Sequence, residues 1–144
     1  MNNNTEVTKT KLTIPEGRGM AQKIYEYLSE CNVARSCGGK IKEYKSLGGN
    51  TVVRLMFNKW LDVEYYGTTL FQWDLETAEV QVILHSEYLT HSTMERYPAA
   101  SKLIAFDVGF RIIKGEPYLI GNGNKIKLPL DKPFNLMEWA DKLF

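Results

Sequence analysis

The sequence predicts one α+β domain: an antiparallel meander sheet of about five to seven strands, with an N-terminal, a central and a C-terminal helix packed on it. Helical periodicity is confined to a stretch near the N-terminus and to the last residues. Between them, short alternating apolar and polar runs are separated by Gly, Asn and Asp, which is typical of strands joined by tight turns. A chain of 144 residues can bury a core without disulfides or a structural metal.

The composition narrows the class of protein further. The chain is 44% hydrophobic and 24% charged, as ordinary globular domains are. Its net charge of +1 argues against bulk electrostatic binding to nucleic acid. No apolar run approaches the ~20 residues of a membrane helix, and the first residues lack the basic and apolar regions of a secretory signal. We therefore expect a cytoplasmic protein without a membrane partner.

The N-terminal part divides into a tail and a helix. Residues 1–11 are polar and lack periodicity, so we expect a flexible tail, followed by a single domain over 12–144. A helix is predicted from about Arg18 to Asn32, because its apolar residues recur on one face: Met20, Ile24, Tyr27, Leu28 and Cys31.

The meander is predicted to follow the Gly48–Asn50 turn, after a weakly indicated strand over 41–47. Thr51–Phe57 and Leu61–Tyr66 each alternate apolar with mixed or polar residues. A three-residue loop, Asn58–Trp60, would pair Phe57 with Leu61 and keep the apolar residues together, whereas a two-residue turn would mix the faces. We favour the three-residue loop, since burial fixes strand register.

Two more strands continue the meander. Gly67 ends the second strand, and Thr68–Trp73 forms the third. After a turn at Asp74–Thr77 comes Glu79–His85, in which Val80, Val82 and Leu84 are expected to point inward.

The central helix is predicted from a capping-box spacing, Ser92 to Glu95, in which Ser92 would be the cap. Pro98 lies too far inside such a helix. Either a new helix begins at Pro98 as its first residue, or the Ser92 turn is separate. The residues that follow, up to Phe106, carry Leu103 and Phe106 as candidates for burial.

The last third is predicted to contain a hairpin and a helix. Strands over Phe110–Ile113 and Tyr118–Ile120 flank a loop at Lys114–Pro117, and Lys125–Leu128 is a further short strand. Leu136–Phe144 is amphipathic. Two faces of this helix are possible against the sheet: Met137, Ala140 and Phe144, or Leu136, Trp139 and Leu143.

We predict no catalytic residues. Ser86, His91 and Asp107 are the residue types of a hydrolytic triad, with His85 nearby, but no Gly-x-Ser-x-Gly elbow surrounds the serine. Both histidines are therefore expected to be ordinary hydrogen-bonding residues. A small hydrolase stays an alternative.

We also predict no metal and no cofactor. His91 and Glu95 have helical ligand spacing, but a third ligand would have to be His85 or Glu87. The sequence contains no phosphate-binding loop. It also contains no paired-cysteine motif, so Cys31 and Cys37 are expected to be reduced thiols.

An aromatic surface is the first candidate for partner binding. Arg54 and Tyr66 are expected to share a sheet face, with Trp60 at the adjoining loop, and Arg and aromatic residues dominate many interfaces. The predicted partner-binding residues are Arg54, Trp60, Tyr66 and Trp73. The alternatives are that a helix covers this face, or that Arg54 merely pairs with Glu64.

A basic cluster is the second candidate. Its residues, which would form a nucleic-acid patch, are Arg35, Lys40, Lys42 and Lys45. We favour the simpler interpretation that this is a solvated strand face.

Three short motifs point to a family. They are Gly49-Asn50-Thr51-Val52-Val53-Arg54-Leu55, Thr90-His91-Ser92-Thr93-Met94-Glu95-Arg96, and Gly109-Phe110-Arg111-Ile112 with Tyr118-Leu119 after it. This order resembles small proteins of tailed bacteriophages, which have a G-N-T-x-[VI]-x-[LF] strand and a T-x-[ST]-T-x-x-R helix start. The matching positions are Asn50, Thr51, Thr90, Ser92, Thr93 and Arg96. We expect helix capping and a buried arginine hydrogen bond there, rather than ligand contact.

The resemblance implies a phage accessory protein in the cytoplasm of the infected bacterial host. The expected function is that of a non-enzymatic binding protein that inhibits or sequesters a host component, including a counter-defence, anti-CRISPR-like inhibitor. A host protein is the expected partner, with nucleic acid or a small nucleotide as alternatives. A nucleic-acid-binding accessory module is the alternative function.

Overall fold

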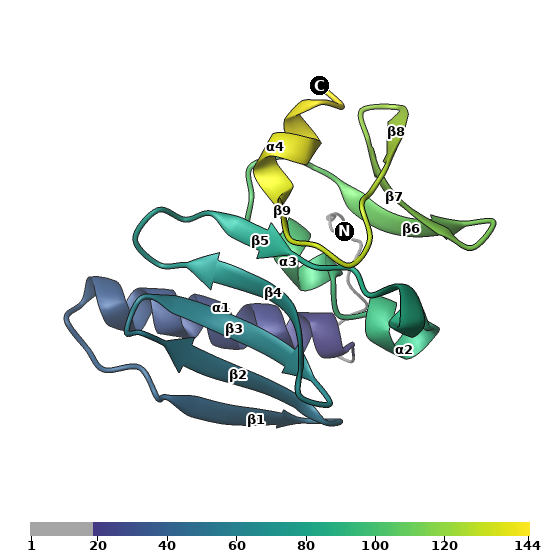
Figure 1. Ribbon diagram of the computed structural model, residues 1–144. Coiled ribbons are helices and arrows are strands. Elements are labelled where there is room, and N and C mark those ends of the chain that lie inside the picture. Colours follow the sequence, from purple (N-terminus) through teal and green to yellow (C-terminus); the bar gives the residue numbers. More distant parts are fainter. Residues whose placement is uncertain (1–18) are drawn as a thin grey trace, which may run out of the picture.

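The computed structural model describes residues 19–144. The predicted tail over 1–11 therefore lies outside the described residues. The α+β class is confirmed, with helices from the N-terminal, central and C-terminal parts of the chain (Figure 1). No helix within residues 19–144 combines the length and apolarity needed to cross a bilayer.

The strands form two antiparallel sheets. A six-stranded sheet has the order β1-β2-β3-β4-β5-β9, and a three-stranded sheet has the order β6-β7-β8. The large sheet falls within the predicted range, whereas the division into two sheets was not predicted. The strands of the large sheet are β1 Tyr44–Gly48, β2 Thr51–Met56, β3 Trp60–Tyr65, β4 Thr68–Asp74, β5 Val80–Val82 and β9 Phe134–Asn135. Those of the small sheet are β6 Gly109–Ile113, β7 Glu116–Gly121 and β8 Asn124–Lys127.

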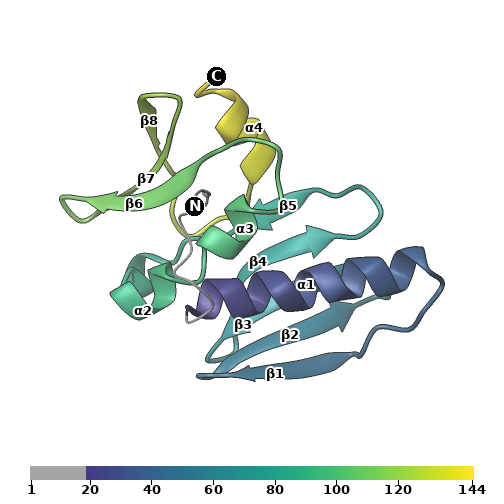
Figure 2. The ribbon, with the colours of Figure 1, turned by 180° about the vertical axis from the view of Figure 1, so that it is seen from behind.

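The long helix α1, Met20–Ser36, crosses one face of the large sheet (Figure 2). Its buried residues include Ile24, Leu28 and Cys31, as the apolar periodicity predicted. The helix continues past the predicted end at Asn32, and its turns are closed only where Gly38 takes a left-handed backbone, with φ of 78°. Inward side chains of the sheet complete this core: Val53, Leu61, Val63, Phe71, Val80 and Val82.

The β2–β3 hairpin keeps the predicted faces but uses a different loop. The loop is Phe57–Lys59, one residue earlier than the predicted Asn58–Trp60, and Leu55 lies opposite Leu61. A shift of the loop by one residue moves the cross-strand pairing by two positions, so the apolar residues still share a face. Phe57, expected on that face, instead occupies the turn with φ of 54° and is 81% exposed.

The central helices begin at different residues from those predicted. Helix α2, His91–Met94, is capped by Thr90, whose Oγ1 accepts a hydrogen bond from the Thr93 amide at 3.2 Å. The predicted cap, Ser92, is wrong, because its exposed side chain already lies inside the helix. Helix α3, Pro98–Ser101, begins at Pro98, which is the first of the two alternatives predicted from the sequence.

The C-terminal helix α4, Leu136–Asp141, packs against β5 and β9 of the large sheet and against β7 of the small sheet (Figure 1). The Asn135 side chain caps it by accepting from the Glu138 amide at 3.1 Å. Of the two predicted faces, the one with Leu136 and Leu143 is buried, together with Ala140. The other face is not, because its larger members remain exposed: Met137 and Phe144.

Replacement of Thr90 by Ala is expected to lower the free energy of unfolding by about 1 kcal/mol, because the first turn of α2 loses its side-chain cap. Urea denaturation measures the change. Ser92→Ala is the matched control and should leave the midpoint within error. A larger loss for Ser92→Ala than for Thr90→Ala would contradict the assignment of the cap.

Candidate functional site

A buried arginine brings the family-motif positions together. Arg96 is only 4% exposed. Its Nε donates to Thr51 Oγ1 at 2.9 Å, and its Nη2 donates to the Gly49 carbonyl at 3.1 Å. Its Nη1 donates to the Ser92 carbonyl. The guanidinium is thereby bonded to acceptors on both sides, as a buried cation requires.

The other motif residues support this arrangement. The Asn50 carbonyl accepts from the Tyr66 amide at 2.9 Å, and Asn50 has the positive φ of a tight turn. Thr93 is buried, with its hydroxyl 3.0 Å from that of Thr90. Thr90 thus caps α2, and Arg96 makes the buried hydrogen bonds of this corner.

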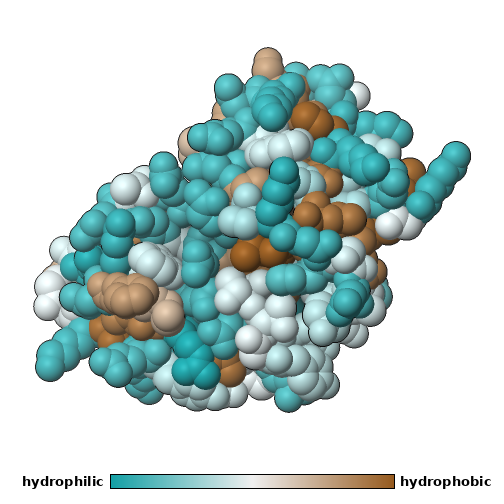
Figure 3. All heavy atoms as spheres, viewed as in Figure 1, coloured by the Kyte–Doolittle hydropathy of each residue, from teal (hydrophilic) through white to brown (hydrophobic). Residues whose placement is uncertain are grey.

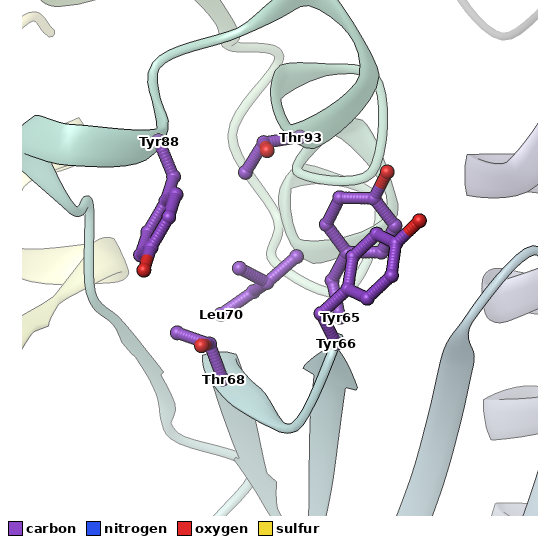
Figure 4. A pocket seen from close by; sticks show the side chains of 6 residues that line it. All are labelled: Tyr65, Tyr66, Thr68, Leu70, Tyr88 and Thr93. Carbon is purple, nitrogen blue, oxygen red and sulfur yellow. The ribbon is translucent and has the colours of Figure 1, made fainter.

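A cavity of about 140 Å³ opens beside this arginine (Figure 4). We call it the tyrosine hollow. Tyr88 stands across from Tyr65 and Tyr66, with Leu70 between them. The Arg96 guanidinium lies 3.8 Å from the centre of the Tyr65 ring, a cation–π contact that holds this ring in place. The lining residues carry no formal charge: Tyr65, Tyr66, Thr68, Leu70, Tyr88 and Thr93.

Sequence reasoning found only part of this hollow. It singled out Tyr66 and Thr93, but it missed Tyr65 and Tyr88. Tyr65 ends β3, where it is half-buried and packs against the core. Tyr88 comes from Ser86–Tyr88, a short 3₁₀ segment that follows β5. These tyrosines are far apart in the sequence, so no local pattern indicates that they meet.

The outer face of the large sheet, opposite α1, is the second surface. Figure 3 shows this face, on which hydrophilic side chains cover most of the sheet. Arg54 points away from the core, as predicted, and its Nε lies 3.1 Å from Glu64 Oε1. Its guanidinium also lies 4.9 Å from the centre of the Tyr44 ring. The alternative in which Arg54 pairs with Glu64 is therefore the observed one.

The four predicted partner-binding residues do not form one surface. Trp73 is 8% exposed and lies on the inner face opposite Leu61, so it belongs to the core. Tyr66 was expected beside Arg54, but it lies in the turn after β3, where its side chain is 70% exposed. Only Trp60 stays on the face of Arg54. The reason is that Tyr66 leaves the strand alternation, while Trp73 follows it to the opposite face.

Two carboxyl groups are buried side by side on the outer face. Asp62 is 4% exposed and Glu64 is 9% exposed. Burial raises the pKa of Asp62 to about 7, and the neighbouring Glu64 adds to the rise. Thr69 Oγ1 donates to Asp62 Oδ2 at 3.1 Å, while Oδ1 has no hydrogen-bond partner among residues 19–144.

The basic cluster divides in two. Lys40, Lys42 and Lys45 line a groove of about 220 Å³ against α1, together with Tyr27 and Glu30. Arg35, by contrast, donates to the Asn58 carbonyl at 3.0 Å and lies 3.8 Å from Glu76. Arg35 thus holds the β2–β3 loop and does not belong to the lysine groove.

The histidines and the serine that could have formed a hydrolase site make other contacts. His85 Nε2 lies 2.7 Å from the Thr69 carbonyl, and the exposed His91 lies 3.7 Å from Glu95. The Ser86 amide donates to Asp131. In the part of the chain that the structure describes, no hydrogen bond joins Ser86, His91 and Asp107, and no group of three or more His, Cys, Asp or Glu is placed to hold a metal. Cys31 and Cys37 are free thiols.

Comparison of the chain with protein-family models, with curated proteins and with solved structures found no match. The candidate sites therefore rest on geometry: the tyrosine hollow, the outer sheet face and the lysine groove.

Asp62 makes the stability of the protein depend on pH. Its folded pKa of about 7 lies above the ordinary 3.8, so its stabilising contribution is complete below pH ~4 and is lost as the pH rises through about 7. The wild type should be less stable at pH ~8 than at pH ~5, by on the order of 2 kcal/mol. Asp62→Asn should remove most of this difference.

Urea denaturation at the two pH values measures the effect. Glu87→Gln, at an exposed carboxyl group in Ser86–Tyr88, is the control and should keep the pH dependence of the wild type. Equal stability of the wild type at both pH values would show that Asp62 is ionised without penalty.

Proposed function

We propose that this chain is a non-enzymatic binding protein whose tyrosine hollow receives an uncharged side chain of a protein partner. The observation that carries the proposal is the concentration of three tyrosines around one open cavity beside the buried Arg96. Tyrosine provides a large contact area at a low cost in side-chain entropy, which is why it is frequent at binding hot spots.

The exposure of the rings supports this function. Tyr66 is 70% exposed and Tyr88 is 48% exposed, so both present apolar surface to solvent. The wall on the side of Tyr66 is rigid, because the neighbouring Tyr65 ring contacts a guanidinium that is itself held by three acceptors. A rigid aromatic wall loses little entropy on binding.

The lack of charge in the hollow favours a protein over a nucleotide. The residues that line it offer hydroxyl groups and apolar carbon but no cation for a phosphate. A volume of about 140 Å³ suits one apolar side chain rather than a base with its sugar and phosphates.

We further propose that the partner is a host protein and that the chain is a phage accessory protein acting in the cytoplasm of the infected bacterium. This origin is supported by the resemblance of the motif positions Asn50, Thr51, Thr90 and Arg96 to small phage proteins. The same residues build the corner beside the hollow. Inhibition or sequestration of a host component, including a component of host defence, is the corresponding activity.

Replacement of Tyr66 and Tyr88 by Ala should weaken partner binding by more than ~1 kcal/mol each, because each change removes one wall of the hollow. The test is affinity capture from a bacterial lysate with the wild type and with the double variant, followed by titration of the enriched protein. Val33→Ala, at an apolar residue of α1 that is 61% exposed, is the control.

The double variant should keep its circular dichroism spectrum, since both rings are largely in solvent. The proposal fails if the captured protein binds the double variant as tightly as the wild type, or if Val33→Ala weakens binding equally.

The lysine groove supports a second candidate function, a nucleic-acid-binding accessory module. Lys40, Lys42 and Lys45 converge on one groove, and within residues 19–144 none of them forms an ion pair. Three cations that face the same hollow can contact successive phosphates.

The salt dependence of binding separates the two functions. If the groove binds single-stranded DNA through three lysines, log affinity should fall with log salt with a slope of about −2 to −3. The triple variant with Lys40, Lys42 and Lys45 changed to Ala should lose this binding. A triple variant of equal charge at Lys102, Lys125 and Lys132 should retain it. A flat salt response in the wild type eliminates this function.

A further inference from the structure

The outer face of the large sheet contains a second hollow, of about 170 Å³, which we call the sheet hollow. It lies near the end of β3 opposite to the tyrosine hollow, because Trp60 begins that strand and Tyr65 ends it. Its lining residues are Trp60, Gln72, Asp74, Glu79 and Gln81. An indole ring, two amides and two carboxylates thus meet on a face that no described helix covers (Figure 1).

Strand register explains this arrangement. One cross-strand row contains Trp60 opposite Asp74, whose amide donates to the Glu79 carbonyl at 2.9 Å. The neighbouring row contains Asp62 opposite Gln72, which lies opposite Gln81. Side chains in adjacent rows that share a face are neighbours. Asp62 therefore belongs to the same face and stands beside Gln72 and Trp60.

The carboxylates in these two rows differ in whether they have hydrogen-bond or ion-pair partners. Asp74 is occupied, since Oδ1 accepts from the amides of Glu76 and Thr77, and Oδ2 lies 3.4 Å from Lys59. Glu79, by contrast, is exposed and pairs with no cation within residues 19–144. Asp62 is more than nine-tenths buried, yet its Oδ1 has no partner in the described part of the chain. Asp62 does not line the sheet hollow itself, but its carboxyl group lies next to Gln72, which does, so its charge acts on a ligand in the hollow through a short distance.

We propose that the sheet hollow, with Asp62 beside it, binds an arginine side chain of a partner protein. A guanidinium supplies five donors in one plane, which suits the carboxylate of Glu79 and the amide oxygens of Gln72 and Gln81. Its flat face stacks on an indole ring such as that of Trp60. Of the two carboxylates that line the hollow, Asp74 is paired with Lys59, so Glu79 supplies the negative charge that complements a cationic side chain.

Arginine fits this surface better than lysine. An ammonium group offers fewer donors and is held less well by an aromatic face, whereas the guanidinium uses both. The charged and polar groups that face Asp62 come from three strands. Arg54 on β2 is paired with Glu64, Glu64 on β3 is half of the buried carboxyl pair, and β4 contributes Thr69 and Gln72.

Binding of a cation beside Asp62 should release a proton. At neutral pH the carboxyl group is partly protonated, because burial raises its pKa to about 7. A guanidinium nearby favours the ionised form, so part of a proton leaves on binding and affinity rises with pH. This inference does not depend on the tyrosine hollow.

The probe is a blocked tetra-arginine peptide, with a tetra-citrulline peptide as its uncharged counterpart. Titration calorimetry at pH ~7, in two buffers of different ionisation enthalpy, gives both the affinity and the number of protons released. Backbone amide NMR locates the binding site. We expect tetra-arginine to perturb the amides around Trp60, Gln72 and Gln81 and to bind at least threefold more tightly than tetra-citrulline.

Variants assign the contacts. Glu79→Gln should weaken tetra-arginine binding at least threefold, whereas the control Glu87→Gln should change it less than twofold. Asp62→Asn should abolish proton release, and its unchanged amide spectrum outside the sheet face would show that the fold is intact. The proposal is overturned if tetra-citrulline binds equally well, if Glu79→Gln weakens binding less than threefold, if Glu87→Gln weakens it as much, or if the wild type releases no proton.

Discussion

The buried guanidinium of Arg96 is the interaction on which the rest of this molecule depends. A cation in the interior is tolerated only when its donors are satisfied, and here the acceptors come from the β1–β2 turn and from α2, more than 40 residues apart in sequence. The turn is closely packed, and its backbone conformation favours glycine. A side chain at Gly49 would meet Met20 at 3.1 Å and Arg96 at 3.5 Å, and its φ is +56°. The start of α1 is packed at the same corner.

Strand β3 contributes side chains to two surfaces of different chemistry. Its inward residues, Leu61 and Val63, join the core under α1, while its outward residues include Trp60, Asp62 and Glu64. A register shift opposite Val63 and Glu64 places Thr69 across from Glu64, and the Thr69 hydroxyl thereby reaches Asp62. One strand thus connects an uncharged hollow rimmed by tyrosines to an acidic hollow walled by an indole ring.

Most of the fold could be predicted from local patterns, because each pattern reflects a local physical rule. The helical face of Ile24, Leu28 and Cys31 follows from a 3.6-residue period. The order of the meander strands follows from alternation and turn residues. The sequence-based predictions were wrong where two local rules compete. Ser92 has the spacing of a cap, but Thr90 precedes it with an extended backbone and reaches the same turn. Phe57 looks like a core residue, but the tight loop exposes it.

The sequence by itself determined the class of the fold, the core faces and the residues of the motif corner, since periodicity and turn chemistry act over a few residues. Only the tertiary structure decided where the surfaces lie. The tyrosine hollow needs the end of β3 to meet a 3₁₀ segment more than 20 residues later, and the sheet hollow needs the exact register of β3, β4 and β5. Contacts between distant segments are set by packing of the whole chain around one core, and no short window of residues contains that information.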